Sequence, residues 1–334
     1  MNYVPVVSNT GDPLMPCHPA RARQLVHRGD ALRRFSRGLF YIQLTTNTTK
    51  GKQDIACGID PGSKYEGFSV RDAKRTFVNI HANAVVHVSR ALKQRRDLRR
   101  SRRGRNPPHR QRKANRGSRG IPPSTKARWY WKYRIARWLS RLFPITIYVI
   151  EDTSSRNRSR RRNRCKFFSP IKVGKMFLYG VLSTISPVLV KKGICTKTLR
   201  EAYGVKKTQE KAEEVWEAHC VDAWVLATEA VSGTTKPDNR SITRVTPIKL
   251  NRRQLHITQP EKGGVRRRYG GTRSQGFKRG SWVLHKKWGC CFVGGSSKGF
   301  ISLHSIRTGR RLTQKAKPHD CKILCYSSWR TWSV

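Results

Sequence analysis

Four side chains in this sequence could together hydrolyse a phosphodiester with the help of a metal. They are Asp60, Glu151, His219 and Asp222, and each belongs to or follows a segment rich in apolar residues. Carboxylate oxygens are the ligands that Mg²⁺ prefers, and two such ions about 3.5 to 4 Å apart would stabilise the attacking water and the leaving oxygen. His219 could position that water or take its proton. The products would be a 5′-phosphate and a 3′-hydroxyl.

Two of the carboxylates are expected at the ends of strands. Residues 54–70 predict a strand, a tight turn and a second strand, with Asp60 at the end of the first strand and Pro61-Gly62 in the turn. The continuous, largely β-branched run 145–150 predicts a buried strand that ends at Glu151. Taken alone, Asp60 could instead cap its turn, and Glu151 could be a solvated strand end.

The third acidic element is expected on a helix. Apolar residues recur at helical spacing from Thr208 to Val231, and Ser232-Gly233 supplies the break that ends this helix. His219 and Asp222 are three residues apart, so they would share one face of it. Taken alone, such a pair is more often an exposed feature of a helix face than a site.

Positive charge is concentrated in a run from Lys93 to Arg119, in which Leu98 is the only sizeable apolar side chain. No apolar stripe holds this run against a core, and like charges three and four residues apart disfavour an isolated helix. Residues 92–103 are therefore expected to form an ordered helix only where phosphates screen them, the alternative being a disordered basic segment. The expected nucleic-acid-binding residues are Arg95, Arg96, Arg99, Arg100, Arg102 and Arg103.

The overall charge points to a polyanionic partner. The chain has 334 residues and a formal net charge of +52, from 71 Lys and Arg against 19 Asp and Glu. Such a charge repels itself in the compact state, so a nucleic acid that neutralises it is expected in the native assembly. A membrane surface is the weaker alternative, because the basic residues do not lie along one amphipathic helix and no apolar run approaches the ~20 residues of a spanning helix.

The start of the chain and the cysteines indicate a reducing compartment. Residues 1–16 lack the basic start and the apolar stretch of a secretory signal, so we expect a cytoplasmic protein that associates with the nucleoid when bound to DNA. The nine cysteines do not form two spaced Cys-x-x-Cys knuckles, although Cys290-Cys291 and the pair Cys321 and Cys325 come close. Buried free thiols are the expectation, and a structural zinc is not indicated.

Two smaller modules flank these elements. Near the N-terminus, the sequence predicts a strand at 3–8, a basic helix near 20–28 and a strand around 40–44. From 247 to 334, short apolar runs separated by glycines predict a small β-barrel. The basic surface of that barrel would suit a DNA duplex.

Five motifs together resemble those of the transposon-encoded IscB and IsrB proteins. Pro13–Pro16, with Cys17–Arg23 after it, looks like their PLMP module, and Gly58–Lys64 looks like their first RuvC motif. The arginine-rich run resembles their bridge helix. Val149–Glu151 is similar to the second RuvC motif, and His219–Ala223 is similar to the third.

This resemblance implies an α/β fold: an RNase H-like (RuvC) mixed sheet with flanking helices, split by the arginine-rich bridge helix, with a small N-terminal PLMP module and a C-terminal β-barrel-like domain. The implied metal ligands are Asp60, Glu151 and Asp222, with His219 as a catalytic partner. The expected domains are 1–50 for the PLMP module, 51–88, 121–165 and 166–240 for the three RuvC parts, 89–120 for the bridge helix and linker, and 241–334 for a β-rich domain that binds guide RNA or the DNA next to the target.

The resemblance also implies partners, namely a guide RNA called omega RNA and a double-stranded DNA target with a displaced single strand. IscB relatives carry an HNH nuclease between the second and third RuvC motifs. No His-Asn-His constellation lies between Glu151 and His219, and the interval looks too short for that insert. This favours the IsrB branch, a monomeric ribonucleoprotein that nicks the displaced DNA strand only.

Two other hypotheses remain open at this point. One is a nuclease that acts on branched DNA without a guide, for which so long an arginine run is not required. The other is a non-catalytic basic RNA-binding protein whose acidic residues are structural. Loss of activity on substitution of Asp60, and a single abundant RNA bound to the protein, would separate both from the guided nuclease.

Overall fold

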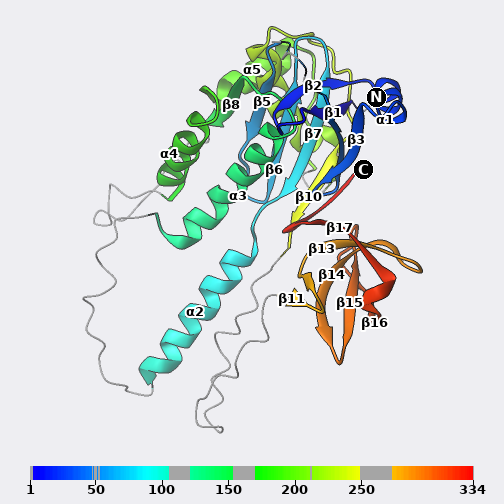
Figure 1. Cartoon of the computed structure of the whole chain (residues 1–334). Coiled ribbons are helices and arrows are strands. Elements are labelled where there is room, and N and C mark those ends of the chain that lie inside the picture. The colour runs from blue at the N-terminus through cyan, green and yellow to red at the C-terminus, as the bar shows by residue number, and fades with distance from the viewer. Residues whose placement is uncertain are drawn as a thin grey trace. The chain divides into compact units, whose positions relative to one another are not determined.

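The computed structural model describes residues 3–46, 48, 51, 53–104, 121–152, 170–210, 213–248 and 273–333 (Figure 1). The chain separates into two compact units. The first unit contains residues 1–85, 119–245 and 333–334, and the second contains 86–118 and 246–332. The candidate catalytic side chains all belong to the first unit.

The N-terminal module is a small mixed sheet with one helix. Its elements are β1 (Val4–Val7), β2 (Pro13–Cys17), α1 (Pro19–His27), β3 (Ala31–Ser36) and β4 (Leu39–Leu44). The strand order is β2-β1-β4-β3, and β1 runs parallel to β4. The predicted strands at 3–8 and 40–44 and the helix near 20–28 are confirmed, whereas β2 and β3 add two strands that the sequence analysis did not predict.

A mixed sheet forms the centre of the first unit. Its strands are β5 (Ala56–Asp60), β6 (Tyr65–Arg71), β7 (Thr76–Asn83), β8 (Ile147–Asp152), β9 (Val188–Lys192) and β10 (Thr243–Pro247). Within the first unit, these six strands lie in the order β10-β7-β6-β5-β8-β9. Strand β6 is antiparallel to both of its neighbours, and the β5-β8, β8-β9 and β7-β10 pairs are parallel. Parallel pairs of this kind require both faces of the sheet to be covered.

Helices cover the two faces. On one face lie α3 (Pro123–Ser140) and α4 (Pro170–Ser183), and the hydroxyl of Tyr148 in β8 donates to the carbonyl of Ala136 in α3 over 3.3 Å. On the other face lies α7 (Val221–Ala230), which packs on β5, β6 and β8. Helix α5 (Gly193–Ala202) packs against α7. This arrangement confirms the expected RNase H-like fold.

The single helix predicted from Thr208 to Val231 is wrong. The helical part is split into α6 (Trp216–His219) and α7, with a break at Cys220, and Thr208 precedes both. His219 and Asp222 therefore lie on different helices and share no helix face. The break coincides with a close approach to the sheet, since a Cβ atom on Gly67 would lie 1.9 Å from the carbonyl oxygen of His219.

The second unit contains a basic helix and an antiparallel sheet. The helix, α2, runs from His87 to Gly104 and includes the predicted helical residues 92–103. The remaining elements are β11 (Arg273–Ser274), β12 (Phe277–Lys278), β13 (Ser281–His285), β14 (Gly289–Ser297), β15 (Phe300–Ser305), β16 (Arg311–Ala316), the short 3₁₀ helix at Pro318–Asp320, β17 (Cys321–Tyr326) and β18 (Trp329–Ser333). Five strands pair in the order β16-β15-β14-β13-β17, so β16 and β17 are the edges of an open sheet.

No helix in the described part of the chain is both long and apolar enough to cross a membrane. Cys57, Cys220 and Cys291 are buried free thiols, as expected, whereas Cys195 and Cys290 are free but exposed.

Candidate metal centre

Strand pairing brings Asp60 and Glu151 together. The parallel strands β5 and β8 pair Gly58 with Val149 and Ile59 with Ile150. The next residues in this register are Asp60 and Glu151, and because side chains alternate along a strand, both point to the face that α7 covers. The sequence predicted each carboxylate at the end of its own strand, and the pairing puts the two strand ends side by side.

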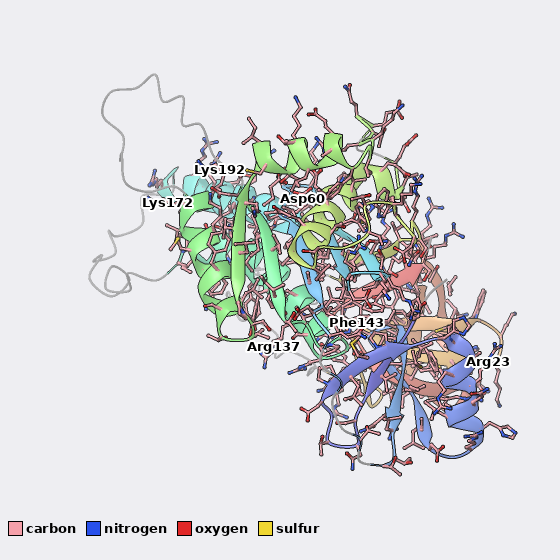
Figure 2. All side chains as sticks on the ribbon, turned by 90° about the horizontal axis from the view of Figure 1, so that it is seen from above. Arg23, Asp60, Arg137, Phe143, Lys172 and Lys192 are labelled. Carbon is pink, nitrogen blue, oxygen red and sulfur yellow. The ribbon has the colours of Figure 1, made fainter. Side chains whose placement is uncertain are left out.

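Two glycines let α7 bring the third carboxylate to the same place. A Cβ atom on Gly58 would lie 1.8 Å from the carbonyl oxygen of Ala223, so any larger residue there would push the helix away. Gly67 makes the equivalent space for His219. Asp222, in the first turn of α7, therefore lies close to the sheet and is buried. In Figure 2, Asp60 lies between the green strands and this yellow-green helix.

The three carboxylates form one cluster. Asp60, Glu151 and Asp222 each offer an oxygen atom, and these atoms lie within 4.8 Å of one another. A set made only of oxygen donors suits a hard divalent cation such as Mg²⁺. This cluster, called the carboxylate site below, could therefore hold a metal ion.

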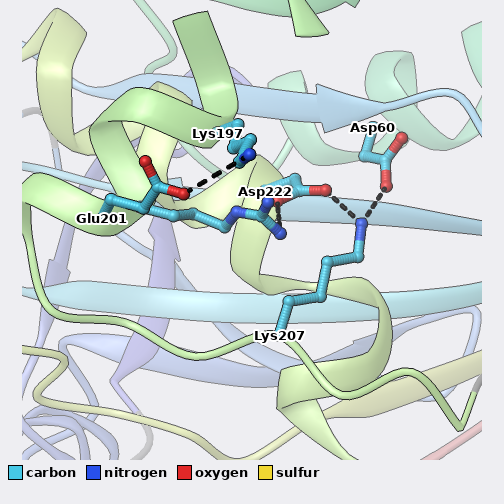
Figure 3. Close-up of polar contacts among 6 residues, drawn as sticks. Asp60, Lys197, Glu201, Lys207 and Asp222 are labelled. Atoms are coloured by element: carbon cyan, nitrogen blue, oxygen red, sulfur yellow. Dashed lines mark hydrogen bonds and ion pairs between the residues drawn. The ribbon is translucent and has the colours of Figure 1, made fainter. Parts of the chain in front are cut away.

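Two basic side chains contact the carboxylate site. Lys207 forms an ion pair with Asp222, and its Nζ atom lies 4.0 Å from Oδ2 of Asp60 (Figure 3). Arg200 of α5 places Nη1 at 3.2 Å from Oδ1 of Asp222. Neither residue was among the predicted site residues, because both come from a basic stretch in which nothing distinguishes them from their neighbours.

The close packing of like charges changes the acidity of the site. Burial raises the pKa of Glu151 to about 8, and the charges of Asp60 and Asp222 act in the same direction. Burial also raises the pKa of Asp60, while Lys207 opposes this effect. Side by side in a buried place, the carboxylates cannot all ionise without a compensating cation. Before such a cation binds, Glu151 keeps its proton at neutral pH.

His219 lies beside the carboxylate cluster and outside it. Its ring centroid is 4.6 Å from that of Tyr65 and 4.4 Å from that of His81. The pairing of β5, β6 and β7 places Asp60, Gly67 and His81 in one row across the sheet, and the backbone of His219 covers the middle of that row. The imidazole is thus on the same face as the carboxylates.

His81 is a buried histidine that the sequence analysis missed. Its side chain is 1% exposed, and neither ring nitrogen has a hydrogen-bond partner in the described structure. Burial lowers its pKa to about 3, and the charges of His219 and Arg244 act in the same direction. His81 is therefore neutral at physiological pH. Nothing in the local sequence marks it, because it is one residue of an ordinary buried strand.

A buried ion pair lies on the opposite face of β6. Nζ of Lys132, from α3, donates to Oε1 of Glu66 over 2.6 Å, and the two side chains are only 6% and 1% exposed. Lys132 also donates to the carbonyl of Gly62, in the turn that follows Asp60, over 3.3 Å. This Glu66–Lys132 pair was not predicted either, since its members come from separate segments.

The predicted nucleic-acid-binding arginines lie on α2. Arg95, Arg96, Arg99, Arg100 and Arg103 are all exposed there. The side chain of Arg102 and the residues from 105 to 120 lie outside the described part of the chain. An exposed helix with this composition can contact several phosphates at once.

The chain is similar to a protein family and to a solved structure. A family model described as RRXRR protein matches residues 4–166, which include Asp60, Glu151 and α2 but not Asp222. Among solved structures, the chain is similar to T. thermophilus RuvC in complex with Holliday junction substrate, at 15% identity and a TM-score of 0.30, over 53% of this chain and 93% of that one. At that TM-score the likeness supports no statement about function. No curated protein matches the chain.

Proposed function

We propose that this protein is an RNA-guided DNA endonuclease that nicks one strand by Mg²⁺-dependent hydrolysis in the carboxylate site. The observation that carries the proposal is the convergence of Asp60, Glu151 and Asp222 within 4.8 Å on an RNase H-like sheet. In a chain with 71 basic and 19 acidic residues, three clustered carboxylates are an uncommon arrangement that a metal site explains.

In this reaction, a water oxygen attacks the phosphorus, the bond from phosphorus to the 3′ oxygen breaks, and that oxygen takes up a proton. The products are a 5′-phosphate and a 3′-hydroxyl. His219 is the candidate to accept the proton of the attacking water, because it lies beside the cluster on the same face of the sheet. Asp60, Glu151 and Asp222 would hold the Mg²⁺, which when bound supplies positive charge to the phosphate in the transition state.

Guidance by RNA is supported by charge. The net charge of +52 far exceeds what the carboxylate site needs for its substrate, and α2 exposes a row of arginines with no apolar stripe. In the second unit, a cavity of about 340 Å³ is lined by polar groups that include Arg279, Arg311 and Gln314. We assign this domain to contacts with guide RNA or with the DNA next to the target.

Cutting of a single strand is supported by the number of candidate metal sites. The described residues contain one cluster of potential metal ligands, the carboxylate site. The sequence has no histidine between Glu151 and His219, so the interval in which IscB relatives carry an HNH nuclease lacks the histidines of such a site. These features favour the IsrB-like alternative.

The catalytic part of the proposal is tested with D60A and E151A. Both substitutions are expected to abolish Mg²⁺-dependent nicking while RNA binding persists, because the two activities use different side chains. D54A is a matched control, since Asp54 is an exposed acidic residue six positions before Asp60. Nicking by either site variant at the rate of D54A would reject the carboxylate site as the nuclease centre.

The guided part is tested by sequencing the nucleic acid that copurifies with the full chain. One abundant structured RNA is expected, and adding it together with a complementary DNA target should switch on nicking. A random collection of RNAs, combined with cleavage of branched DNA, would point to the guide-independent nuclease. Random RNA without any cleavage would point to a non-catalytic RNA-binding protein.

A further inference from the structure

Lys207 occupies a defined position in the carboxylate site. It forms an ion pair with Asp222, and its Nζ lies 4.0 Å from Oδ2 of Asp60, so the ammonium group sits between these two carboxylates (Figure 3). Glu151 also offers an oxygen atom within 4.8 Å of one of Asp60. Asp60 therefore faces two places for a cation: one next to Glu151 and one next to Asp222.

The backbone around Lys207 is fixed on both sides. The amide of Val205 donates to the carbonyl of Arg200 over 3.0 Å, and the amide of Thr208 donates to the carbonyl of Glu217 over 3.2 Å. The side chain of Lys207 is 27% exposed, in contrast to the exposed neighbour Lys206. Lys207 thus extends from a short anchored segment into the site and is not a freely moving surface lysine.

We propose that Lys207 is a catalytic residue that supplies the second positive charge of the site, so that the carboxylates hold one divalent cation, next to Asp60 and Glu151. The proposal deepens the proposed function and rests on it. The proposal predicts one metal ion in the carboxylate site, whereas the sequence analysis expected two. The ammonium group takes the place of the second ion, beside Asp60 and Asp222, from which it can contact a phosphate oxygen of the DNA.

The charges of the site favour one divalent cation together with Lys207. Asp60, Glu151 and Asp222 carry three negative charges when ionised, and Lys207 with Arg200 carries two positive ones. One divalent cation and one phosphodiester bring the total to zero. A second divalent cation would leave two positive charges without partners in a largely buried place, which is costly unless the ions are paired.

Arg200 supports the assignment of the metal ion to the position next to Glu151 and of Lys207 to the position next to Asp222. It contacts Oδ1 of Asp222, while Lys207 contacts Oδ2 of the same carboxylate. Both oxygens of Asp222 therefore already have cationic partners, whereas Glu151 has no such partner among the ion pairs of the described residues. Among the described residues, the side of the site next to Glu151 is therefore the one without an ion-paired basic side chain.

The test counts bound Mn²⁺ by electron paramagnetic resonance on the purified full chain and measures nicking in parallel. D60A provides the background, because it carries the same nucleic acid and the same surface but lacks the shared ligand. The variants are K207M, which keeps the length without the charge, K207R, which keeps the charge, and K206M as the control at the exposed neighbour.

We expect the wild type and K206M to bind one Mn²⁺ above the D60A background, and K207M to bind two. Nicking by K207M should fall about 100-fold, the size of effect seen when one group that stabilises transition-state charge is removed, and K207R should lose less. Because K207M must still bind Mn²⁺, the count also shows that its site is folded.

Two Mn²⁺ ions in the wild type, or nicking by K207M at the wild-type rate, would overturn the role of Lys207 and leave the proposed function intact. Absence of Mn²⁺ above background in the wild type, together with unchanged nicking by D60A, would overturn the proposed function and this inference with it. The two failures are therefore distinguishable.

Discussion

The two faces of the central sheet each combine carboxylates with a lysine, and they do so with opposite results. On the α3 face, Glu66 and Lys132 form a closed pair, 2.6 Å apart and almost fully buried. On the α7 face, Lys207 is shared between Asp60 and Asp222, it is 27% exposed, and Glu151 is a third carboxylate nearby.

The difference lies in charge balance and access. The Glu66–Lys132 pair has one acid for one base, so it neither needs nor admits a further ion. It holds the turn after Asp60 through the carbonyl of Gly62. The carboxylate site has more acids than nearby bases before a metal binds to Glu151, and its lysine reaches solvent. An excess of carboxylate in a largely buried place that solvent still reaches through Lys207 distinguishes this candidate metal site from a structural ion pair.

The sharpest way to break the comparison is to remove one carboxylate of the carboxylate site. E151Q is expected to lower the nicking rate at least about 1000-fold, because losing metal-derived charge stabilisation of several kcal/mol corresponds to that factor. The melting temperature of E151Q without metal should not fall at neutral pH, since the protonated Glu151 carries no charge there and the amide replaces it with a neutral group of similar shape. Nicking assays measure the loss of activity, and thermal unfolding measures the stability. A large drop in the E151Q melting temperature would contradict the difference between the carboxylate site and the Glu66–Lys132 pair.

The Glu66–Lys132 pair should respond in the opposite way. K132M leaves the carboxylate of Glu66 buried without its partner, so the free energy of unfolding is expected to fall by about 3–5 kcal/mol. The double variant K132M/E66M replaces both charges by apolar groups and should recover most of that loss. Urea unfolding of the three chains gives the values. Equal stability of K132M and the wild type would show that the pair contributes little.

The pH dependence of stability should single out Glu151. Its pKa rises from 4.5 to about 8 on folding, so the folded state binds more protons than the unfolded state between these values. Stability of the metal-free chain is therefore expected to fall as pH rises through this window. Mg²⁺ should reverse the fall at its upper end by binding the ionised carboxylate.

Thermal unfolding of the wild type and E151Q from pH 6 to pH 9 measures this effect. The melting temperature of E151Q should depend less on pH, because the amide does not titrate. Parallel curves for the two chains would assign the pH dependence to other groups and would remove Glu151 from the argument.

The smallest effect on stability is expected from a substitution of His81. This residue lies in the same row across the sheet as Asp60, but it contacts neither Lys132 nor Lys207 in the ion pairs compared above. H81F keeps a flat ring against Tyr65 and His219 and removes two buried nitrogens that have no hydrogen-bond partner in the described structure. Replacing such groups by an apolar ring of similar shape should change the free energy of unfolding by less than about 1 kcal/mol. A larger loss in urea unfolding would show that His81 has a polar role.

Local patterns in the sequence were sufficient for much of the fold. Strands β5 and β8 were predicted with Asp60 and Glu151 at their ends, because apolar runs, β-branched residues and a Pro-Gly turn act over a few neighbouring residues. The helical periodicity around Asp222 was also recognised, yet its division into α6 and α7 was not. That division coincides with the close approach of His219 to Gly67, which lies in another segment of the chain.

The sequence by itself thus determined which carboxylates could bind a metal, and its net charge of +52 predicted a polyanionic partner. Only the tertiary structure decided that Gly58 admits α7 to the sheet, that Lys207 enters the site and that Glu66 finds Lys132, 66 positions away. The reason is physical: residue type and spacing fix the conformation of short segments, whereas these contacts depend on the close packing of segments that are far apart in the chain.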